Sequence, residues 1–325
     1  LSSDREAPIL ALNVAGLDIP SDGPPRAPKP LPSTVRADAW QLLEAVEKRW
    51  AAERFLPEFT ISYDAISYRC AQIGPPDTIT QEPRQSNREP SARNWCLRRI
   101  DETHIDIRSL GMPKWTSEEL VRVGGSSGLV LVSGSFGSGK STTSAACFKS
   151  WVNAHGGVGI TLEDPPEKPL QGFHEGGQIY QVAVRNNGFA EAIKSSRRWA
   201  YRYLFLGEVR DQASAEELLQ IALGGPMVLT TIHASGPVEA LMALSKFAAG
   251  SGSASAVNDR IAACISGVLW QTLAVGKLDI QYLSFRGRNA AAMRTKISEG
   301  RYRLLHEDLS YQSNLRSLGR IADSF

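Results

Sequence analysis

The chain has 325 residues, a length typical of about two domains, and 42% of them are hydrophobic, which allows a sizeable buried core. A net charge of +2 argues against a global basic field that recruits nucleic acid or a membrane surface. No apolar run approaches the roughly 20 residues that cross a bilayer, and no signal peptide is recognisable. The four cysteines are widely spaced, so we expect reduced thiols in a cytosolic protein, without a disulfide framework or a zinc site.

The N-terminal part of the chain is predicted to be an arm followed by a helix. Seven of the 18 prolines fall within residues 1–35, and such a segment cannot hold a helix or a sheet ladder. We expect a disordered Pro-rich arm there, with a docking peptide for a partner as the less favoured alternative. Apolar residues then recur at helical spacing from Asp38 to about Arg54 and predict a helix.

A small sheet is predicted next. Three segments alternate apolar and polar residues and are predicted strands: 59–63, 68–70 and 95–98. The polar stretch 74–94 between them is typical of a long loop. These elements predict an N-terminal α+β domain over residues 36–110, and Gly111-Met112-Pro113 predicts a hinge over residues 111–116.

Beyond the hinge, the pattern changes to alternating strands and helices. Thr116-x-x-Glu119 matches a capping box and predicts the start of a short helix. The predicted strands are 129–133, 158–162, 203–207 and 227–232. The predicted helices are 140–153, 188–199, 213–223, 236–248 and 257–271. This alternation predicts an α/β domain over residues 117–325, with a mostly parallel sheet covered on both faces.

Residues 134–141, GSFGSGKS, form a complete P-loop between a predicted strand and a predicted helix. In such a loop the helix N–H groups and the helix dipole bind phosphates. Lys140 is predicted to reach the β- and γ-phosphates, and the Ser141 hydroxyl to ligate Mg²⁺. We therefore expect ATP and Mg²⁺ as cofactors; a chance glycine-rich turn is disfavoured by the context. The predicted nucleotide-binding residues are Gly134, Ser135, Phe136, Gly137, Ser138, Gly139, Lys140, Ser141 and Thr142.

Acidic residues follow two of the predicted strands, at the sheet edge where active sites form in parallel sheets. Glu163 is a candidate general base for the attacking water, and a plain acidic turn is an equal alternative. Glu208 follows an apolar strand and a glycine, the Walker B arrangement, and is predicted to hold the Mg²⁺ shell or to position the water. Arg210 is predicted to pair with Asp211 rather than to contact the γ-phosphate.

A third strand end carries Thr231 and His233. An isolated histidine is more often structural than catalytic. This strand end, however, is expected to adjoin the nucleotide, so His233 is a candidate γ-phosphate sensor.

The order of these motifs resembles the secretion and pilus motor ATPases, in particular the PilT-type retraction ATPases. Their Walker A, Asp box, Walker B and His box correspond here to GSFGSGKS, EDPPE, GEVRD and TTIH. The resemblance runs from about Phe59 to Leu273. Phe189–Lys194 is similar to the family's helix before Walker B, and Ile265–Leu273 to its helix ending in SQxL.

This resemblance implies a RecA-like P-loop NTPase core with a smaller, PAS-like N-terminal domain, assembled as a homohexamer. It also implies that Arg69 and Arg98 are arginine fingers that reach a nucleotide across a subunit boundary. The implied function is ATP hydrolysis that drives domain motion about the hinge and powers a type IV pilus or a type II or type IV secretion machine. The implied partner is an inner-membrane platform or a secretion-channel protein, with the chain in the cytoplasm, peripheral to that membrane.

The chain also departs from the family pattern. Arg197–Arg202 stands where an Arg–Asp–Pro–Asp segment is usual, Gly225-Pro226 replaces Gly-His, and the Asp box has a second proline. Neither the tetra-cysteine zinc module of extension motors nor the C-terminal retraction signature is evident, so a Dot/Icm-type type IV secretion ATPase fits about as well.

Two other functions stay open. A RecA-like nucleic-acid translocase needs basic loops along a channel, although a solvated surface is the favoured interpretation of the basic residues near the C-terminus. The second is a nucleotide switch that does not hydrolyse ATP. The basic candidates for the translocase are Arg286, Arg288, Arg294, Lys296, Arg301 and Arg303.

Overall fold

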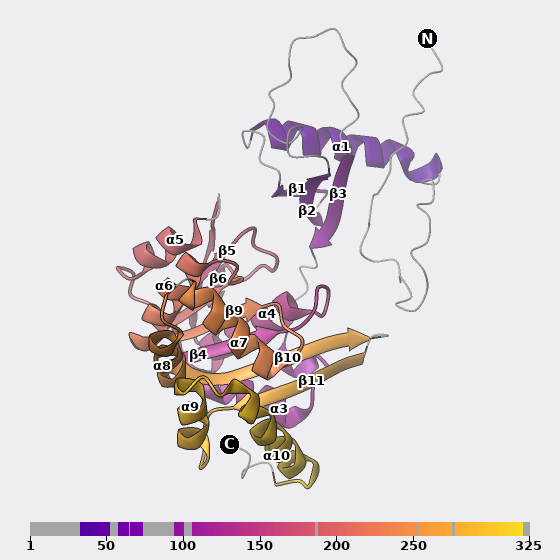
Figure 1. Ribbon diagram of the computed structural model, residues 1–325. Helices are drawn as coiled ribbons and strands as arrows, with labels where there is room; N and C mark the ends of the chain where they lie inside the picture. Colours follow the sequence, from indigo (N-terminus) through magenta and orange to yellow (C-terminus); the bar gives the residue numbers. More distant parts are fainter. Residues whose placement is uncertain are drawn as a thin grey trace, which may run out of the picture. The chain divides into compact units, whose positions relative to one another are not determined.

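The chain forms two compact units, Leu1–Thr103 and His104–Phe325, in a computed structural model (Figure 1). The structure describes residues 33–52, 58–64, 66–73, 94–100, 106–185, 188–250, 252–274 and 277–320. The predicted arm up to residue 32 and the predicted polar loop up to residue 93 lie outside the described residues. Among the described residues, no helix is both long and apolar enough to span a membrane.

The first unit contains one helix and three antiparallel strands, in the predicted order. Its elements are α1 (Ser33–Ala52), β1 (Glu58–Tyr63), β2 (Ile66–Ile73) and β3 (Asn94–Ile100), with the sheet order β1-β2-β3. Helix α1 begins earlier than the predicted Asp38 and buries Val46 and Trp50 against the sheet residues Phe59 and Trp95. Trp95 Nε1 donates to Glu47 Oε1 at 2.6 Å, so its polar atom also finds a partner on the helix.

The second unit is built on an eight-stranded sheet in the order β11-β10-β4-β9-β8-β5-β7-β6. The strands are β4 (Gly128–Ser133), β5 (Gly157–Glu163), β6 (Gly172–His174), β7 (Gly177–Ala183), β8 (Tyr203–Leu206), β9 (Met227–Ile232), β10 (Ile265–Ala274) and β11 (Lys277–Ser284). Neighbours from β10 to β7 are parallel, and β11 and β6 pair antiparallel at the two edges. The predicted, mostly parallel sheet is therefore confirmed.

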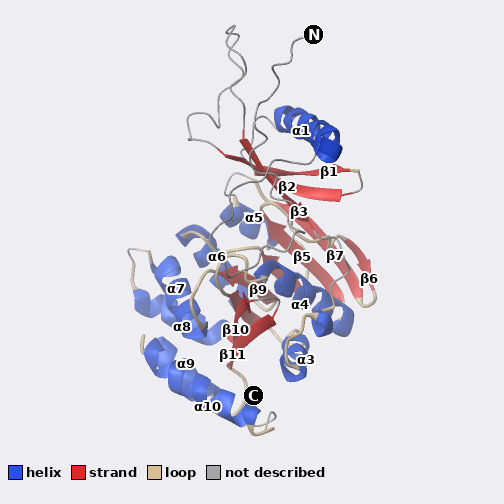
Figure 2. Ribbon diagram, turned by 90° about the vertical axis from the view of Figure 1, so that its right-hand side faces the viewer, coloured by secondary structure: helices blue, strands red, loops and turns tan. Residues whose placement is uncertain are grey.

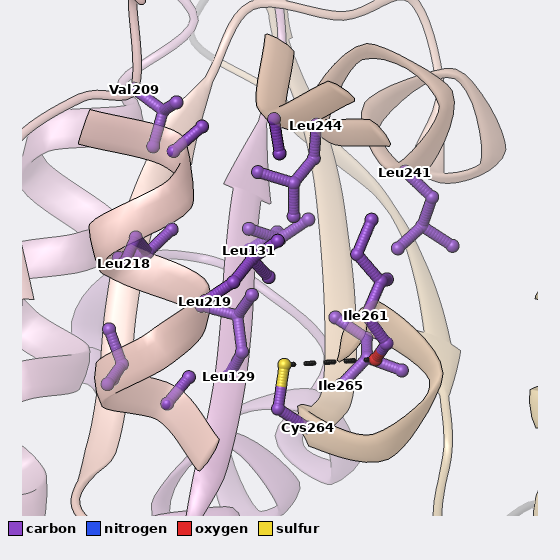
Figure 3. Packing of buried hydrophobic residues seen from close by; sticks show 14 of the residues in the cluster. Leu129, Leu131, Val209, Leu218, Leu219, Leu241, Leu244, Ile261, Cys264 and Ile265 are labelled. Carbon is purple, nitrogen blue, oxygen red and sulfur yellow. Dashed lines mark hydrogen bonds between the residues drawn. The ribbon is translucent and has the colours of Figure 1, made fainter. Parts of the chain in front are cut away.

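Helices cover both faces of this sheet (Figure 2). Alternate residues of the central strands point to opposite faces, so each face presents apolar side chains that pack against helices. The second unit's helices are η1 (Ile107–Ser109), α3 (Lys114–Val123), α4 (Lys140–His155), α5 (Phe189–Ser196), α6 (Gln212–Leu223), α7 (Pro237–Ala249), α8 (Ala254–Cys264), α9 (Ala290–Ser298), η2 (Tyr302–Leu304) and α10 (Leu305–Ser317). Val130 and Val132 belong to the core under α3 and α4. Leu129 and Leu131 point the other way, among side chains of α6, α7 and α8 (Figure 3).

The predicted helix 257–271 is wrong in its second half. Helix α8 ends at Cys264, and the next residue begins β10, which pairs in parallel with β4 from Ile265 to Trp270. The family helix suggested for Ile265–Leu273 is therefore a strand. This run is buried on both faces of the sheet, so its apolar residues show no strand-like alternation. Gly267 lies where a Cβ would collide with the Tyr282 hydroxyl of β11.

The predicted capping box at Thr116 and Glu119 is also wrong. Helix α3 begins at Lys114 after Pro113, and Thr116 N donates to Pro113 O at 2.9 Å within the first turn. Thr116 and Glu119 are buried, and Glu119 Oε2 accepts from Arg122 Nε at 2.6 Å. The proline fixes the backbone at the helix start, so a cap further along the chain is not needed.

Candidate nucleotide-binding site

The P-loop joins β4, a central strand of the sheet, to the N-terminus of α4. Gly139 precedes the helix in the left-handed region, with φ of 83°. Gly134 also has a positive φ, of 152°, and a Cβ there would collide with Ser138 Oγ and with the backbone oxygen of Gln271. The tight loop leaves the first-turn N–H groups of a 16-residue helix without intrahelical partners.

Lys140 is held at the mouth of this loop. Its Nζ donates to Gly134 O at 3.0 Å and to Ser135 O at 2.7 Å, and it lies 3.4 Å from His233 Nδ1. Burial lowers the pKa of Lys140, against the opposing charges of Glu208 and Glu167. Among the described residues, two backbone carbonyls and the His233 ring are within bonding distance of the ammonium, while Glu208 and Glu167 supply opposing charge nearby.

The other predicted P-loop residues differ in exposure. Ser141 and Thr142 lie half-buried in the first turn of α4. Ser138 is buried, and its Oγ is among the buried atoms that have no hydrogen-bond partner in the described part of the chain. Phe136, by contrast, is 84% exposed, so its ring projects away from the loop.

Glu208 and His233 meet at the ends of β8 and β9. His233 Nε2 lies 3.2 Å from Glu208 Oε1, and Arg210 Nε donates to Glu208 Oε2 at 2.8 Å. Thr231 Oγ1 donates to Gly207 O at 2.6 Å, which fixes the turn that presents Glu208. With the Lys140 contact, these residues form a polar chain that links the P-loop to two further strand ends.

The predicted pairing of Arg210 with Asp211 is wrong. Arg210 binds Glu208, and Asp211 Oδ1 caps α6 by accepting from Ser214 N at 2.8 Å. Residues next to each other in an extended segment point to opposite sides, whereas residues two apart share a side. Glu208 and Arg210 have the spacing that lets them meet.

Glu163 ends β5, beside β8. A Cβ built on Gly207 would lie 3.5 Å from Glu163 Cγ, so Glu163 is adjacent to the turn that carries Glu208. Glu163 is 6% exposed, and its Oε1 accepts from Gln181 Nε2 at 2.8 Å. Burial raises the pKa of this carboxyl, and the Gln181 hydrogen bond opposes the shift. A buried carboxyl with a raised pKa is suited to accept a proton.

Sequence reasoning missed Gln181 and Gln271. Gln181 lies on β7, which was not predicted, and also donates to Lys168 O at 2.8 Å. Gln271 lies on β10 and donates to the P-loop carbonyl of Ser138. Its signal was a lone amide within the apolar run that follows Ile265, a pattern that marks a buried polar group needing a partner.

Arg69 and Arg98 lie in the first unit. They are direct register partners on β2 and β3. Their action on a nucleotide stays a prediction.

Comparison with known proteins identifies the family. Residues 89–319 match the family described as "Type II/IV secretion system protein". The putative type II secretion system protein E of Escherichia coli (strain K12) is 34% identical over 176 residues, which cover 51% of this chain and 34% of that relative. The chain spans about a third of the length of such curated relatives.

Two solved structures share the fold. The pilus retraction motor PilT with bound ADP has a TM-score of 0.67 at 20% identity, covering 92% of this chain and 84% of that one. The ATPase DotB of Legionella pneumophila has a TM-score of 0.62 at 18% identity, covering 86% and 77%. Since the family match extends over most of the chain, this protein belongs to the type II/IV secretion system protein family.

Proposed function

We propose that the chain is an ATPase, a motor subunit that hydrolyses ATP to power a type II or type IV secretion machine or a type IV pilus. The observation that carries this proposal is the convergence of Lys140, His233, Glu208 and Glu163 at consecutive strand ends beside the P-loop. Family membership and the likeness to the fold of PilT with bound ADP support it. The surrounding core is proposed to be RecA-like.

The residues present fit a nucleotide. Both the buried Ser138 hydroxyl, which has no hydrogen-bond partner among the described residues, and the Lys140 ammonium, which bonds two carbonyls beside the His233 ring, lie at the helix N-terminus. A phosphate group is the chemistry that such a site accepts, because N–H donors, a dipole and a cation converge there. Lys140 would exchange its two carbonyl partners for phosphate oxygens.

The residues also fit Mg²⁺ held jointly with a nucleotide. The described residues contain no group of three or more His, Cys, Asp or Glu able to hold a metal. Mg²⁺ needs only one or two protein oxygens when phosphates and water complete its shell, and we assign these to Ser141 and Glu208. The ion would offset charge on the β- and γ-phosphates, while Arg210 and His233 hold the Glu208 carboxylate in place.

Glu163 is proposed as the general base that takes a proton from the attacking water, at the carboxylate that Gln181 orients. His233 is proposed to sense the γ-phosphate, because it lies between the Lys140 ammonium and Glu208. Movement of either neighbour upon binding would therefore change the contacts of the imidazole.

The remaining parts of the proposal concern assembly. We propose a homohexamer in which Arg69 and Arg98 complete a neighbour's site, and a PAS-like first unit. The segment 111–116, for which a hinge is predicted, lies within the second unit, and its last three residues begin α3. The proposed partner is an inner-membrane platform or a secretion-channel protein, with the chain at the cytoplasmic side of that membrane. The proposal covers both a pilus and a secretion machine as the system that the chain powers.

Nucleic-acid translocation is less well supported. Several of the basic residues near the C-terminus are occupied by internal contacts. Arg294 donates to Ile265 O at 2.7 Å, Lys296 Nζ lies 2.7 Å from Asp308 Oδ2, and Arg286 donates to Ser126 Oγ at 3.0 Å. Such residues stabilise the fold rather than line a channel.

The test is nucleotide binding by Lys140→Ala, with Lys149→Ala on the same helix as control. Losing a charge-assisted partner is expected to weaken ADP binding by about 10- to 100-fold. Lys149→Ala is expected to bind as the parent does. An unchanged affinity in Lys140→Ala would mean that the loop is not the nucleotide site.

A further inference from the structure

Strand β10 contacts the P-loop through Gln271. Pairing between β10 and β4 ends at Trp270 and Ser133, so Gln271 lies just beyond the paired strands, level with the loop. Its side chain is fully buried, and Nε2 donates to Ser138 O at 2.5 Å. The same Nε2 lies 3.2 Å from the place of a Cβ on Gly139, so the amide also packs against the last loop residue.

Neighbouring residues of β10 reach the other parts of the site. Leu269 O accepts from Ser133 Oγ at 3.1 Å, at the end of the strand that leads into the P-loop. Trp270 Nε1 donates at 3.2 Å to the backbone oxygen of Ala234, the residue that follows His233. Consecutive residues of one strand therefore contact the start of the P-loop, its body and the His233 segment.

The hydrogen bond from Gln271 has a directional consequence. The peptide between Ser138 and Gly139 is trans, because the only cis bond among the described residues is Asp164-Pro165. In a trans peptide the N–H points opposite to the C=O. With the Ser138 carbonyl turned toward β10, the Gly139 N–H points away from β10, as a phosphate-binding loop requires of its donors.

A buried side-chain amide costs folding free energy when one of its polar atoms lacks a hydrogen-bond partner. Gln271 Oε1 is buried and has no hydrogen-bond partner among the described residues, and such an atom destabilises a fold. An apolar side chain would avoid that cost but could not donate to Ser138. The donor function is what distinguishes glutamine from an apolar residue of similar size.

We infer that Gln271 is a positioning residue for nucleotide binding: it fixes the Ser138–Gly139 peptide so that the loop amides face the phosphates. The inference rests on the proposed nucleotide-binding function and adds to it a role for Gln271, which lies in the SQxL-like segment Ile265–Leu273 and outside the Walker A, Asp box, Walker B and His box motifs. Its action is on the loop backbone, and the residue itself does not contact the ligand.

The test compares Gln271→Glu and Gln271→Met with Gln281→Glu, an exposed glutamine on the next strand. ADP affinity in the presence of Mg²⁺ is measured by calorimetry from pH 6 to pH 8.5, and thermal unfolding without nucleotide is recorded alongside. Gln271→Met loses the donor and is expected to weaken binding about tenfold at every pH. Gln281→Glu is expected to match the parent.

Gln271→Glu gives the distinctive signature. Its carboxylate cannot donate to Ser138 O when ionised, and burial raises the pKa of a carboxyl. The affinity defect relative to the parent is therefore expected to be about tenfold or more at pH 8.5 and to shrink as the pH falls, because the protonated carboxyl regains a donor. The affinity of the variant is divided by that of the parent at each pH. Any pH effect that both proteins share, from the ionisable groups that face the same site, then cancels. These groups are Lys140, Glu208, Glu167 and His233.

The outcomes separate the two proposals. Parent-like affinity of folded Gln271→Met and Gln271→Glu at every pH would overturn the positioning role while leaving the nucleotide site intact. A lower melting temperature with parent-like affinity would show a purely structural role and also overturn it. A parent that fails to bind ADP would overturn the proposed function itself, and the positioning role with it.

Discussion

Two glutamates at neighbouring strand ends have different surroundings, and their surroundings suit them to different tasks. Glu163 is buried beside an uncharged amide, and burial raises the pKa of its carboxyl. Glu208 lies between Arg210 and His233 and close to the Lys140 ammonium. A buried carboxyl with a raised pKa is suited to take a proton, whereas the Glu208 carboxylate is held in place by the Arg210 guanidinium and the His233 ring. This difference supports Glu163 as base and Glu208 as the Mg²⁺ carboxylate.

Glu163→Gln is predicted to slow ATP hydrolysis by about 10²–10⁴-fold while leaving nucleotide affinity near that of the parent. The base works only when deprotonated, so the parent's rate should rise with pH through the raised pKa of Glu163. Phosphate release measured across pH tests both points. If Glu163→Gln hydrolyses ATP as fast as the parent, or if the parent's rate does not rise with pH, Glu163 is not the general base.

Thermal unfolding gives an independent check on Glu163. A carboxyl whose pKa is raised by folding contributes stability below its unfolded pKa and loses it as the pH rises through the folded value. Glu163→Gln keeps an acceptor for Gln181 and removes the buried charge. The variant is therefore expected to melt above the parent at alkaline pH and to lose that advantage in acid.

Residue-level chemistry was partly predictable from the sequence. The P-loop, Glu163, Glu208 and His233 are placed by local patterns, each a short motif at the end of an apolar strand. Gln181 and Gln271 could not be assigned in that way, because β7 and β10 bring them to the site from distant parts of the chain. The predicted partner of Arg210 is wrong because neighbouring residues of an extended segment point to opposite sides, so Arg210 contacts Glu208 and not Asp211.

At the level of elements, the central strands β4, β5, β8 and β9 follow the predicted ranges closely, since each is a short apolar run with clear boundaries. The strands at the two edges and next to them were harder to predict. Strand β10 is apolar on both faces and carries no alternation, and β6 and β7 mix polar and apolar residues. Their positions depend on pairing partners rather than on local sequence.

The packing of α3 on α4 supports the P-loop helix. Trp151 of α4 is fully buried, and its Nε1 donates to Leu120 O at 2.6 Å, near the end of α3. Gly124, which follows α3, has no room for a Cβ because the Trp151 ring lies against it. The indole thus satisfies a carbonyl at a buried helix end, where intrahelical partners run out.

Trp151→Phe is predicted to lower stability by about 1–3 kcal/mol, because it removes the indole donor and leaves the buried Leu120 carbonyl with the weak Cys147 thiol donor. In a domain of this size the melting temperature falls by about 2–4 °C for each kcal/mol. Trp199→Phe, at an exposed position, is the control and should melt like the parent. Equal melting temperatures for both variants would show that the indole bond contributes nothing.

At the level of the whole molecule, the P-loop and the candidate arginine fingers belong to different units, each with its own hydrophobic core. Arg69 and Arg98 are direct register partners on β2 and β3, so one strand pair carries both. Arginines on a separate unit suit a site that is completed only in an assembly. An arginine supplied in this way increases turnover by about 10³–10⁵-fold in known phosphoryl-transfer enzymes.

Mixing two inactive variants, Arg98→Ala and Lys140→Ala, is therefore predicted to restore part of the ATPase activity. In a mixed ring some interfaces combine an intact P-loop with an intact arginine. The control replaces Arg98→Ala by the double variant Arg98→Ala/Lys140→Ala, which offers no such interface. If confirmed mixed assemblies stay as inactive as their components, Arg98 does not act across a subunit boundary.

ATP hydrolysis by the strand-end cluster beside the P-loop can be measured directly. The most direct measurement is steady-state phosphate release by the parent, by Glu208→Gln and by Glu216→Gln, an exposed control on α6, each with its ADP affinity. We expect Mg²⁺-dependent turnover in the parent and the control, and a loss of about 10- to 100-fold or more in Glu208→Gln with ADP binding nearly intact. A parent that binds ADP but releases no phosphate, even when assembled, would rule out hydrolysis and favour a nucleotide switch.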